Sequence, residues 1–139
     1  MQFQDTGYAI KKTQHIIHHE MSKKLRTIAM TLPQYSVLKA LEDHGPMTGA
    51  ALAKESFVTP QTMHTLLTSM EKRNLIRRTP EIGNNKSLNI SITNSGLRLL
   101  ADAEHALSGV FKKANRALNS DEHTQLMGLL VKLYDGLSQ

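Results

Sequence analysis

The chain has 139 residues, with 17 Lys and Arg against 12 Asp and Glu, a formal net charge of +5 and no cysteine. This length corresponds to about one domain and leaves little room for a separate catalytic domain, and the lack of cysteine excludes disulfides, thiolate metal sites and cysteine redox sensing. The positive charge favours an anionic partner, and nucleic acid, an anionic membrane surface and plain solubility all agree with it.

A long amphipathic helix is predicted over residues 8–30. Apolar residues recur there at helical spacing, among them Ile10, Ile17 and Met21, whereas basic residues occupy the rest of the helical wheel. Pro33 then interrupts the pattern.

Two shorter helices are predicted next, and each can begin at a threonine. Thr31 is a suitable N-cap for a helix of about twelve residues that stops at Gly45-Pro46. Thr48 is a plausible N-cap for a short helix over residues 49–55.

A fourth helix is predicted over residues 60–73, with Thr59 as N-cap and Pro60 at the first helical position. Four apolar residues lie at positions i, i+3, i+4 and i+7 of this helix, a stripe that must pack inward. They are Met63, Leu66, Leu67 and Met70.

A β-hairpin is predicted after that helix, because the apolar period changes at Leu75. Residues 75–79 and 87–92 have the pattern of strands, and Gly83-Asn84-Asn85 forms the turn between them.

Two more helices complete the chain. The first begins at Thr93 or Asn94 and extends over about 24 residues, with apolar residues spaced as in a helix-pairing seam. The last has a cap at Asn119 or Ser120, and acidic residues follow the cap near the positive end of the helix.

The order of a helix, a short helix, a brief turn, a helix and a hairpin is that of a winged helix-turn-helix, whose second motif helix enters the major groove of DNA. Residues 31–93 are the expected winged region, with the recognition helix at 60–73 and the wing at about 75–93. Gln can pair with adenine, Thr can donate or accept hydrogen bonds, and Lys can neutralise phosphate. The alternative is that the outward face of this helix is polar only because it is in contact with solvent. The candidate DNA-binding residues on the helix are Pro60, Gln61, Thr62, His64, Thr65, Thr68, Ser69 and Lys72.

Basic residues also gather at the hairpin. Arg77, Arg78 and Lys86 join Lys72 and Arg73 in a local excess of positive charge that matches the electrostatic footprint of a phosphate-binding surface. We include Arg77, Arg78 and Lys86 among the candidate DNA-binding residues, with a solvated charge run as the alternative.

Several stretches resemble the MarR family in their order and spacing. They are Leu32-Pro33-Gln34-Tyr35-Ser36-Val37-Leu38, Leu52-Ala53, Val58-Thr59-Pro60-Gln61-Thr62-Met63, Glu71-Lys72-Arg73-Asn74-Leu75-Ile76-Arg77-Arg78, Ile92-Thr93-Asn94-Ser95-Gly96 and Leu118-Asn119-Ser120-Asp121-Glu122. The resemblance implies a single mainly α domain with a small β-hairpin wing. It also implies a helical dimerisation arm made by residues 1–30 and 94–139.

The resemblance further implies a homodimer that binds successive major grooves of a pseudo-palindromic operator in double-stranded DNA and represses transcription. The apolar seams agree with a homodimer. The candidate dimerisation residues are Ile10, Ile17, Met21, Leu107, Phe111, Leu118, Leu126, Leu130, Leu133 and Leu137.

The chain departs from the family at three places. The wing typically carries Asp-x-Arg, where this chain has Asn84 and Lys86, and Lys lacks the planar fork of Arg. We therefore expect weaker or less selective contact of the wing with the minor groove. Phe57 stands where many relatives have Gly, and Asn74 stands where Gly often ends the recognition helix, a position whose left-handed conformation Asn tolerates.

Many relatives release DNA when a small aromatic or phenolic molecule binds between the arm and the winged domain. The resemblance therefore implies an effector of that kind, unidentified here, and no cofactor. His15 and His19 are four residues apart on one helix and His105 lies on another, a spacing compatible with metal binding. Solvated histidines are the reading we favour, and we expect no metal.

Two other classes of function were weighed. The chain has no Gly-rich phosphate loop and no nucleophile elbow, so we do not expect an enzyme. The alternative is a winged-helix module that binds protein or RNA without operator specificity, since a fold alone does not determine function. The first residues lack the pattern of a secretory signal and no stretch has the roughly 18 apolar residues of a membrane span, so we expect a cytoplasmic protein without a membrane partner.

Overall fold

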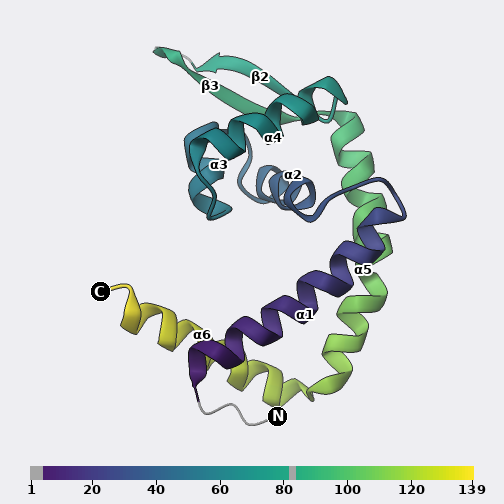
Figure 1. Cartoon of the computed structure of the whole chain (residues 1–139), viewed down its shortest axis with the longest axis vertical. Coiled ribbons are helices and arrows are strands. Elements are labelled where there is room, and N and C mark those ends of the chain that lie inside the picture. Colours follow the sequence, from purple (N-terminus) through teal and green to yellow (C-terminus); the bar gives the residue numbers. More distant parts are fainter. Residues whose placement is uncertain (1–4, 82–83) are drawn as a thin grey trace. The chain divides into compact units, whose positions relative to one another are not determined.

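The computed structural model describes the chain except residues 1–4 and 82–83 and the side chains of residues 81–87. It confirms the predicted fold class, mainly helical with a small antiparallel sheet. Among the helices of the described part, none has both the length and the hydropathy to cross a membrane. The elements in chain order are α1 (Thr6–Arg26), α2 (Leu32–His44), β1 (Met47–Thr48), α3 (Gly49–Glu55), α4 (Pro60–Lys72), β2 (Ile76–Glu81), β3 (Asn84–Ile92), α5 (Asn94–Ala117) and α6 (Ser120–Leu137) (Figure 1).

The chain forms two compact units, residues 1–106 and residues 107–139, and α5 begins in the first and ends in the second. The first unit contains the predicted winged region together with α1. Its core is apolar and draws on every helix of that unit and on the sheet. The most completely buried large side chains of this unit include Leu25, Met30, Leu38, Leu52, Met63, Met70, Ile90 and Leu100.

The three threonines predicted to cap helices do so. Each side-chain oxygen accepts a hydrogen bond from the backbone N–H three residues further on, and such a cap contributes about 1 kcal/mol. The bonds join Thr31 to Gln34 at 3.3 Å, Thr48 to Ala51 at 3.2 Å and Thr59 to Thr62 at 3.1 Å.

The first helix ends earlier than predicted, at Arg26 and not at residue 30. Ala29 has a left-handed backbone, with φ of 55°, and the N–H of Met30 returns to the carbonyl of Leu25 at 3.1 Å. Met30 turns into the core and is only 2% exposed. The apolar pattern therefore continued past the end of the helix because the turn after it is also buried.

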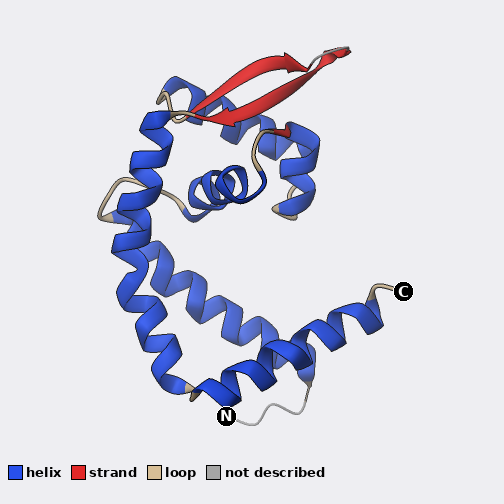
Figure 2. Ribbon diagram, turned by 180° about the vertical axis from the view of Figure 1, so that it is seen from behind, coloured by secondary structure: helices blue, strands red, loops and turns tan. Residues whose placement is uncertain are grey.

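The wing occupies the predicted residues, but its strands extend further toward the turn than predicted, because Asn84 and Asn85 belong to β3 and not to the turn. A third strand joins the wing. β2 pairs antiparallel with β3 from Ile76 opposite Ile92 to Pro80 opposite Leu88, with an irregularity at Pro80–Glu81 (Figure 2). β1 pairs with the other edge of β3, which gives the order β1-β3-β2. β1 has two residues, too few for a strand period to be visible in the sequence.

The start of α5 is hydrogen-bonded to the residues that directly follow α4. Asn74 has φ of 57°, as its tolerance of the left-handed conformation led us to expect. The backbone N–H of Thr93 donates to the carbonyl of Leu75 at 3.1 Å, and the Thr93 hydroxyl donates to the carbonyl of Asn74. The same hydroxyl oxygen accepts from the N–H of Gly96 at 3.0 Å. The helix therefore begins at a fixed point beside the wing.

The second unit, residues 107–139, contains α6 and the end of α5. The side chain of Asn119 caps α6 by accepting from the N–H of Glu122, whose carboxylate accepts in return from the N–H of Asn119, both at 2.9 Å. The large apolar side chains of α6 are exposed in the single chain. They include the predicted dimerisation residues Leu126, Leu130, Leu133 and Leu137.

The other predicted dimerisation residues divide into two groups. Ile10, Ile17 and Phe111 are 41%, 40% and 40% exposed. Leu118 is half-buried. Met21 and Leu107, in contrast, are 9% and 0% exposed within one chain. Side chains that are already buried have little surface left for a second copy, so the part of these two residues in a dimer stays a prediction.

Candidate nucleic-acid interface

α3 and α4 form the helix-turn-helix, and the turn between them is tight. The N–H of Phe57 donates to the carbonyl of Lys54 at 3.3 Å, and the N–H of Val58 donates to that of Ala53 at 3.0 Å. Phe57 has φ of 56° and its side chain is 93% exposed. A phenylalanine therefore occupies a left-handed position that glycine would occupy with less strain.

α4 lies on the core through three of its four predicted inward residues. Met63, Leu67 and Met70 are buried, whereas Leu66 is only half-buried and borders a cavity described below. Leu66 is therefore less buried than we predicted. On the other face, the side chains of Gln61, Thr62, His64, Thr65, Ser69 and Lys72 are exposed, and Pro60 is exposed at the N-terminal end.

Three hydroxyl groups on α4 donate to carbonyls of their own helix, whereas the Thr62 hydroxyl accepts from the Thr59 hydroxyl at 3.0 Å. Thr65 donates to the carbonyl of Gln61 at 3.2 Å, Thr68 to that of His64 at 2.9 Å, and Ser69 to that of Leu66 at 2.8 Å. A hydroxyl that donates to its own helix offers only acceptor lone pairs to a partner. The exposed hydroxyls of Thr65 and Ser69 therefore suit donors on base edges, such as the amino groups of adenine and cytosine.

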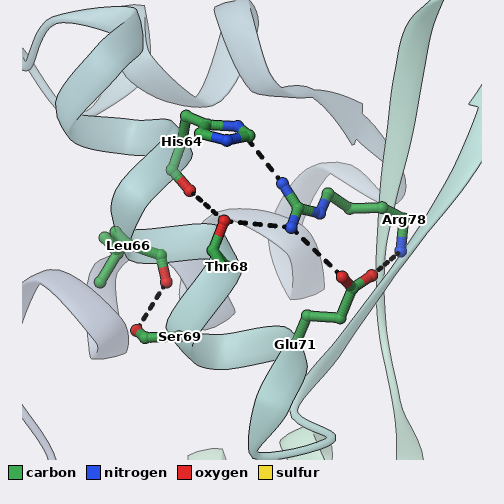
Figure 3. A network of polar contacts seen from close by, with 6 residues as sticks. All are labelled: His64, Leu66, Thr68, Ser69, Glu71 and Arg78. Carbon is green, nitrogen blue, oxygen red and sulfur yellow. Dashed lines mark hydrogen bonds and ion pairs between the residues drawn. The ribbon is translucent and has the colours of Figure 1, made fainter.

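Arg78 connects the wing to α4 (Figure 3). Its Nη2 lies 3.2 Å from a carboxylate oxygen of Glu71 and donates to the Thr68 hydroxyl at 3.2 Å, while Nη1 lies 3.4 Å from Nδ1 of His64. The backbone N–H of Arg78 donates to the other Glu71 oxygen at 3.2 Å. The side chain is 13% exposed, so it holds β2 against α4 and has little surface left for phosphate.

This network changes the electrostatics of the interface. Hydrogen bonds from the side chain and backbone of Arg78 lower the pKa of Glu71. The pairing of Glu71 with Arg78 could not be predicted, since nothing in the local sequence pattern pairs a helix residue with a strand residue seven positions later. Thr68 is half-buried beneath the arginine.

Arg77 is exposed, as is Lys72 at the end of α4. Both residues therefore keep the accessibility that phosphate contact requires. The side chains of Lys86 and Asn84 lie outside the described residues, so their predicted part in minor-groove contact stays a prediction.

A cavity of about 600 Å³ lies within the first unit, between α1, α2, the α3–α4 turn and the first half of α4. Burial raises the pKa of Tyr35, one of its lining residues, which keeps the phenol protonated as a hydrogen-bond donor. The other lining residues are Gln14, His18, Leu32, Pro33, Ser36, Lys39, Ala40, Asp43, His44, Glu55, Ser56, Phe57, Val58, Thr62, Met63 and Leu66.

The cation in this cavity is already paired. Lys39 lies 3.2 Å from Glu104, 3.3 Å from Glu42 and 3.5 Å from Asp43, and hydrogen bonds to Glu104 and Glu42 raise its pKa. Carboxylates therefore outnumber the lysine around the polar wall of the cavity.

The histidines considered as metal ligands are exposed: His15 and His19 on α1, and His105 on α5. Within the described part of the chain, no three His, Cys, Asp or Glu residues are grouped so as to hold a metal ion.

A helix-turn-helix whose second helix is held beside a two-stranded hairpin defines a winged helix-turn-helix protein. Residues 30–84 match the model of the MarR family. The chain is 26% identical to the HTH-type transcriptional repressor Rv2887 of Mycobacterium tuberculosis, over 91% of each chain. The predicted resemblance to the MarR family is confirmed.

Solved structures have the same fold. A mutant MarR from E. coli complexed with operator DNA matches 91% of each chain with a TM-score of 0.83 and 18% identity. The structure of Mycobacterium tuberculosis Rv2887 in complex with salicylic acid matches 93% of this chain and 96% of that one, with a TM-score of 0.74 and 26% identity.

Proposed function

We propose that this protein is a transcriptional repressor that binds a pseudo-palindromic operator in duplex DNA as a homodimer and is released by a small aromatic effector. α4 enters the major groove, and the β2–β3 wing lies along the neighbouring backbone. The residues in contact with bases are Gln61, Thr62, Thr65 and Ser69, and those in contact with phosphate are Lys72, Arg77 and Lys86.

The exposed polar face of α4 is the observation that carries this proposal. It lies directly opposite the buried residues Met63, Leu67 and Met70, so the core fixes which side chains face outward. Gln61 and Thr65 are one turn apart on that face. Arg78 and Glu71 hold the same helix against the wing, so the two DNA-contacting elements move as one.

The exposed apolar residues of α6 support a homodimer. Leu126, Leu130 and Leu133 recur at helical spacing without cover in the single chain, as do Ile10 and Ile17 on α1. An isolated chain with this much apolar surface is unfavourable in water, and a second copy is the partner that the family provides. Two winged regions per particle then explain why the operator has two half-sites.

The cavity beside α1, α2 and α4 is the proposed effector site. Its volume lies in the range of small-molecule sites, and Tyr35, Met63 and Leu66 give it an aromatic and apolar wall. Rv2887, which is similar to this chain, has been solved with salicylic acid. A ligand here touches both α1 and the first half of α4, so it can alter the position of the recognition helix.

The test is selection from a randomised duplex pool with purified protein, followed by binding of the selected duplex over a series of salt concentrations. We expect an enriched pseudo-palindrome and a steep fall of affinity with salt. Weak binding without an enriched motif would contradict the proposal and favour a module that binds protein or RNA.

Two variants separate base contact from phosphate contact. Thr65→Ala should relax base preference at one position of each half-site, at a cost of about 1–3 kcal/mol against the selected sequence. Arg77→Ala should weaken binding to all sequences alike and reduce the salt slope by about one per half-site. A change of base preference in Arg77→Ala with an unchanged salt slope would show that these roles are wrong.

A further inference from the structure

The C-cap residue of the recognition helix is linked to the turn that follows α1. Arg73 is the C-cap of α4, and its Nη1 donates to the backbone carbonyl of Ala29 at 3.2 Å and to Oε1 of Gln34 at 3.4 Å. Ala29 lies in the α1–α2 turn and Gln34 in the first turn of α2. The arginine therefore spans 44 residues of sequence to join α4 with the turn that follows α1.

The acceptors of Arg73 are held in place by other bonds. Gln34 is 9% exposed, and its Oε1 also accepts from the N–H of Thr31 at 3.0 Å in the capping box of α2. The Ala29 carbonyl belongs to a turn whose left-handed residue is Ala29 itself and whose next residue, Met30, is buried. Neither acceptor can follow a moving arginine without breaking a cap or exposing Met30.

We propose that Arg73 is a positioning residue that fixes the angle between α4 and α1, and through it the half-site spacing that the dimer accepts. This inference rests on the proposed function, in which α1 belongs to the dimer arm and α4 reads DNA. Arg73 itself need not touch DNA for this role. Its effect is to keep the recognition helix from pivoting relative to the arm.

The geometry gives this link leverage over the DNA-reading end. α1 and α4 diverge from the end at which Arg73 lies, with α2 between them (Figure 1). At 1.5 Å rise per residue, Leu66 is about 10 Å from Arg73 along the axis of α4 and Pro60 is about 20 Å away. A shift of about 1 Å at Leu66 about this pivot therefore becomes about 2 Å at Pro60, which is enough to break a hydrogen bond to a base.

The experiment measures DNA affinity against half-site spacing. The selected operator is compared with versions in which one base pair is inserted between the half-sites or deleted from between them. Each such change moves a half-site by about 3.4 Å and rotates it by about 34°. The wild type should lose at least tenfold in affinity. Arg73→Met, which lacks both hydrogen bonds, should lose less than threefold because α4 can follow the displaced groove.

Lys72→Met is the matched control, because it removes the same charge from the neighbouring exposed position and leaves the link intact. It should lower affinity for all spacings equally and keep the tenfold discrimination. Arg73→Lys, which keeps the charge but lacks the planar guanidinium whose Nη1 donates both bonds, should behave like Arg73→Met. Thermal unfolding of each variant establishes that it is folded under the conditions of the binding assay.

The outcomes are distinct. If Arg73→Met or Arg73→Lys discriminates spacing as sharply as the wild type, the positioning role of Arg73 is refuted while the proposed function stands. If Lys72→Met also loses discrimination, charge and not the link determines spacing, and the role is again refuted. If the wild type selects no operator, the proposed function fails and this inference fails with it.

Discussion

Gly96 offers the sharpest test of how α5 is attached to the winged region. A Cβ built on Gly96 would lie 2.8 Å from Cγ1 of Ile92 and still closer to the carbonyl oxygen of Leu75. That carbonyl already accepts the N–H of Thr93. The substitution Gly96→Ala therefore pushes the first turn of α5 away from the Leu75 carbonyl to which it is fastened.

The expected loss of stability follows from opposing terms. Alanine is favoured over glycine within a helix by about 0.5–1 kcal/mol. Overpacking costs about 1–3 kcal/mol, and loss of the hydrogen bond to Leu75 adds about 1 kcal/mol. The net destabilisation is about 1–3.5 kcal/mol, or a fall in Tm of roughly 3–12 °C for a chain of this size.

Thermal unfolding at one fixed protein concentration is the assay, because the Tm of a dimer depends on concentration. Gly109→Ala is the matched control, since Gly109 lies on the same helix and a Cβ there meets nothing within 4 Å. It should be neutral or stabilising by up to about 1 kcal/mol. A Gly96→Ala protein as stable as Gly109→Ala would refute the close packing of α5 on Leu75.

Three further predictions concern the turn, the wing and the cavity. Phe57→Gly should stabilise the chain by about 0.5–1 kcal/mol in urea unfolding, because relief of about 1–2 kcal/mol of left-handed strain exceeds the entropy cost of glycine; a loss of stability would mean that the exposed ring is engaged in the dimer. Arg78 lowers the pKa of Glu71 below its ordinary 4.5, so the stability from this pair is present above that value and is lost as the pH falls through the lowered pKa. The Tm of Glu71→Gln should therefore fall less than that of the wild type between about pH 5 and about pH 3, and parallel curves would contradict the pairing. Because Lys39 is already paired with carboxylates, benzamidine should raise the Tm and weaken DNA binding more than its isosteric anion benzoate does, and the opposite ranking would contradict the acidic character of the cavity.

Most of the fold could be predicted because its signals are local. Caps such as Thr31, Thr48 and Thr59 act within one helical turn, and the stripe of Met63, Leu67 and Met70 repeats within one helix. The end of α1 and the strand β1 could not be predicted for opposite reasons. Met30 is buried beyond its helix and so prolongs the apolar pattern, whereas β1 is too short to have any pattern and exists only because β3 has a free edge.

The candidate site was harder to read because composition does not reveal which charges are paired. Arg77 and Arg78 are adjacent and chemically identical in the sequence, yet alternation along β2 exposes Arg77 and turns Arg78 toward α4. The pairing of Arg78 with Glu71 and of Arg73 with Gln34 both depend on tertiary contacts between separate elements. The assignment of individual side chains to bases and phosphates stays a prediction.

These internal pairings change what the basic region can contribute to DNA affinity. Between residues 72 and 86 the chain has five cations: Lys72, Arg73, Arg77, Arg78 and Lys86. Arg78 is bound to Glu71, and Arg73 is held at the α1–α2 turn by neutral backbone and amide oxygens, so we expect the other three per protomer to contact phosphate. The slope of log affinity against log salt is about −0.9 for each phosphate that is neutralised. Three cations per protomer therefore give this region of a dimer a slope of about −5, whereas all five would give about −9. Substituting Arg78 should accordingly leave the salt slope unchanged while weakening binding through the displaced wing, and a slope that falls by about two in an Arg78→Met dimer would mean that Arg78 leaves Glu71 to bind phosphate.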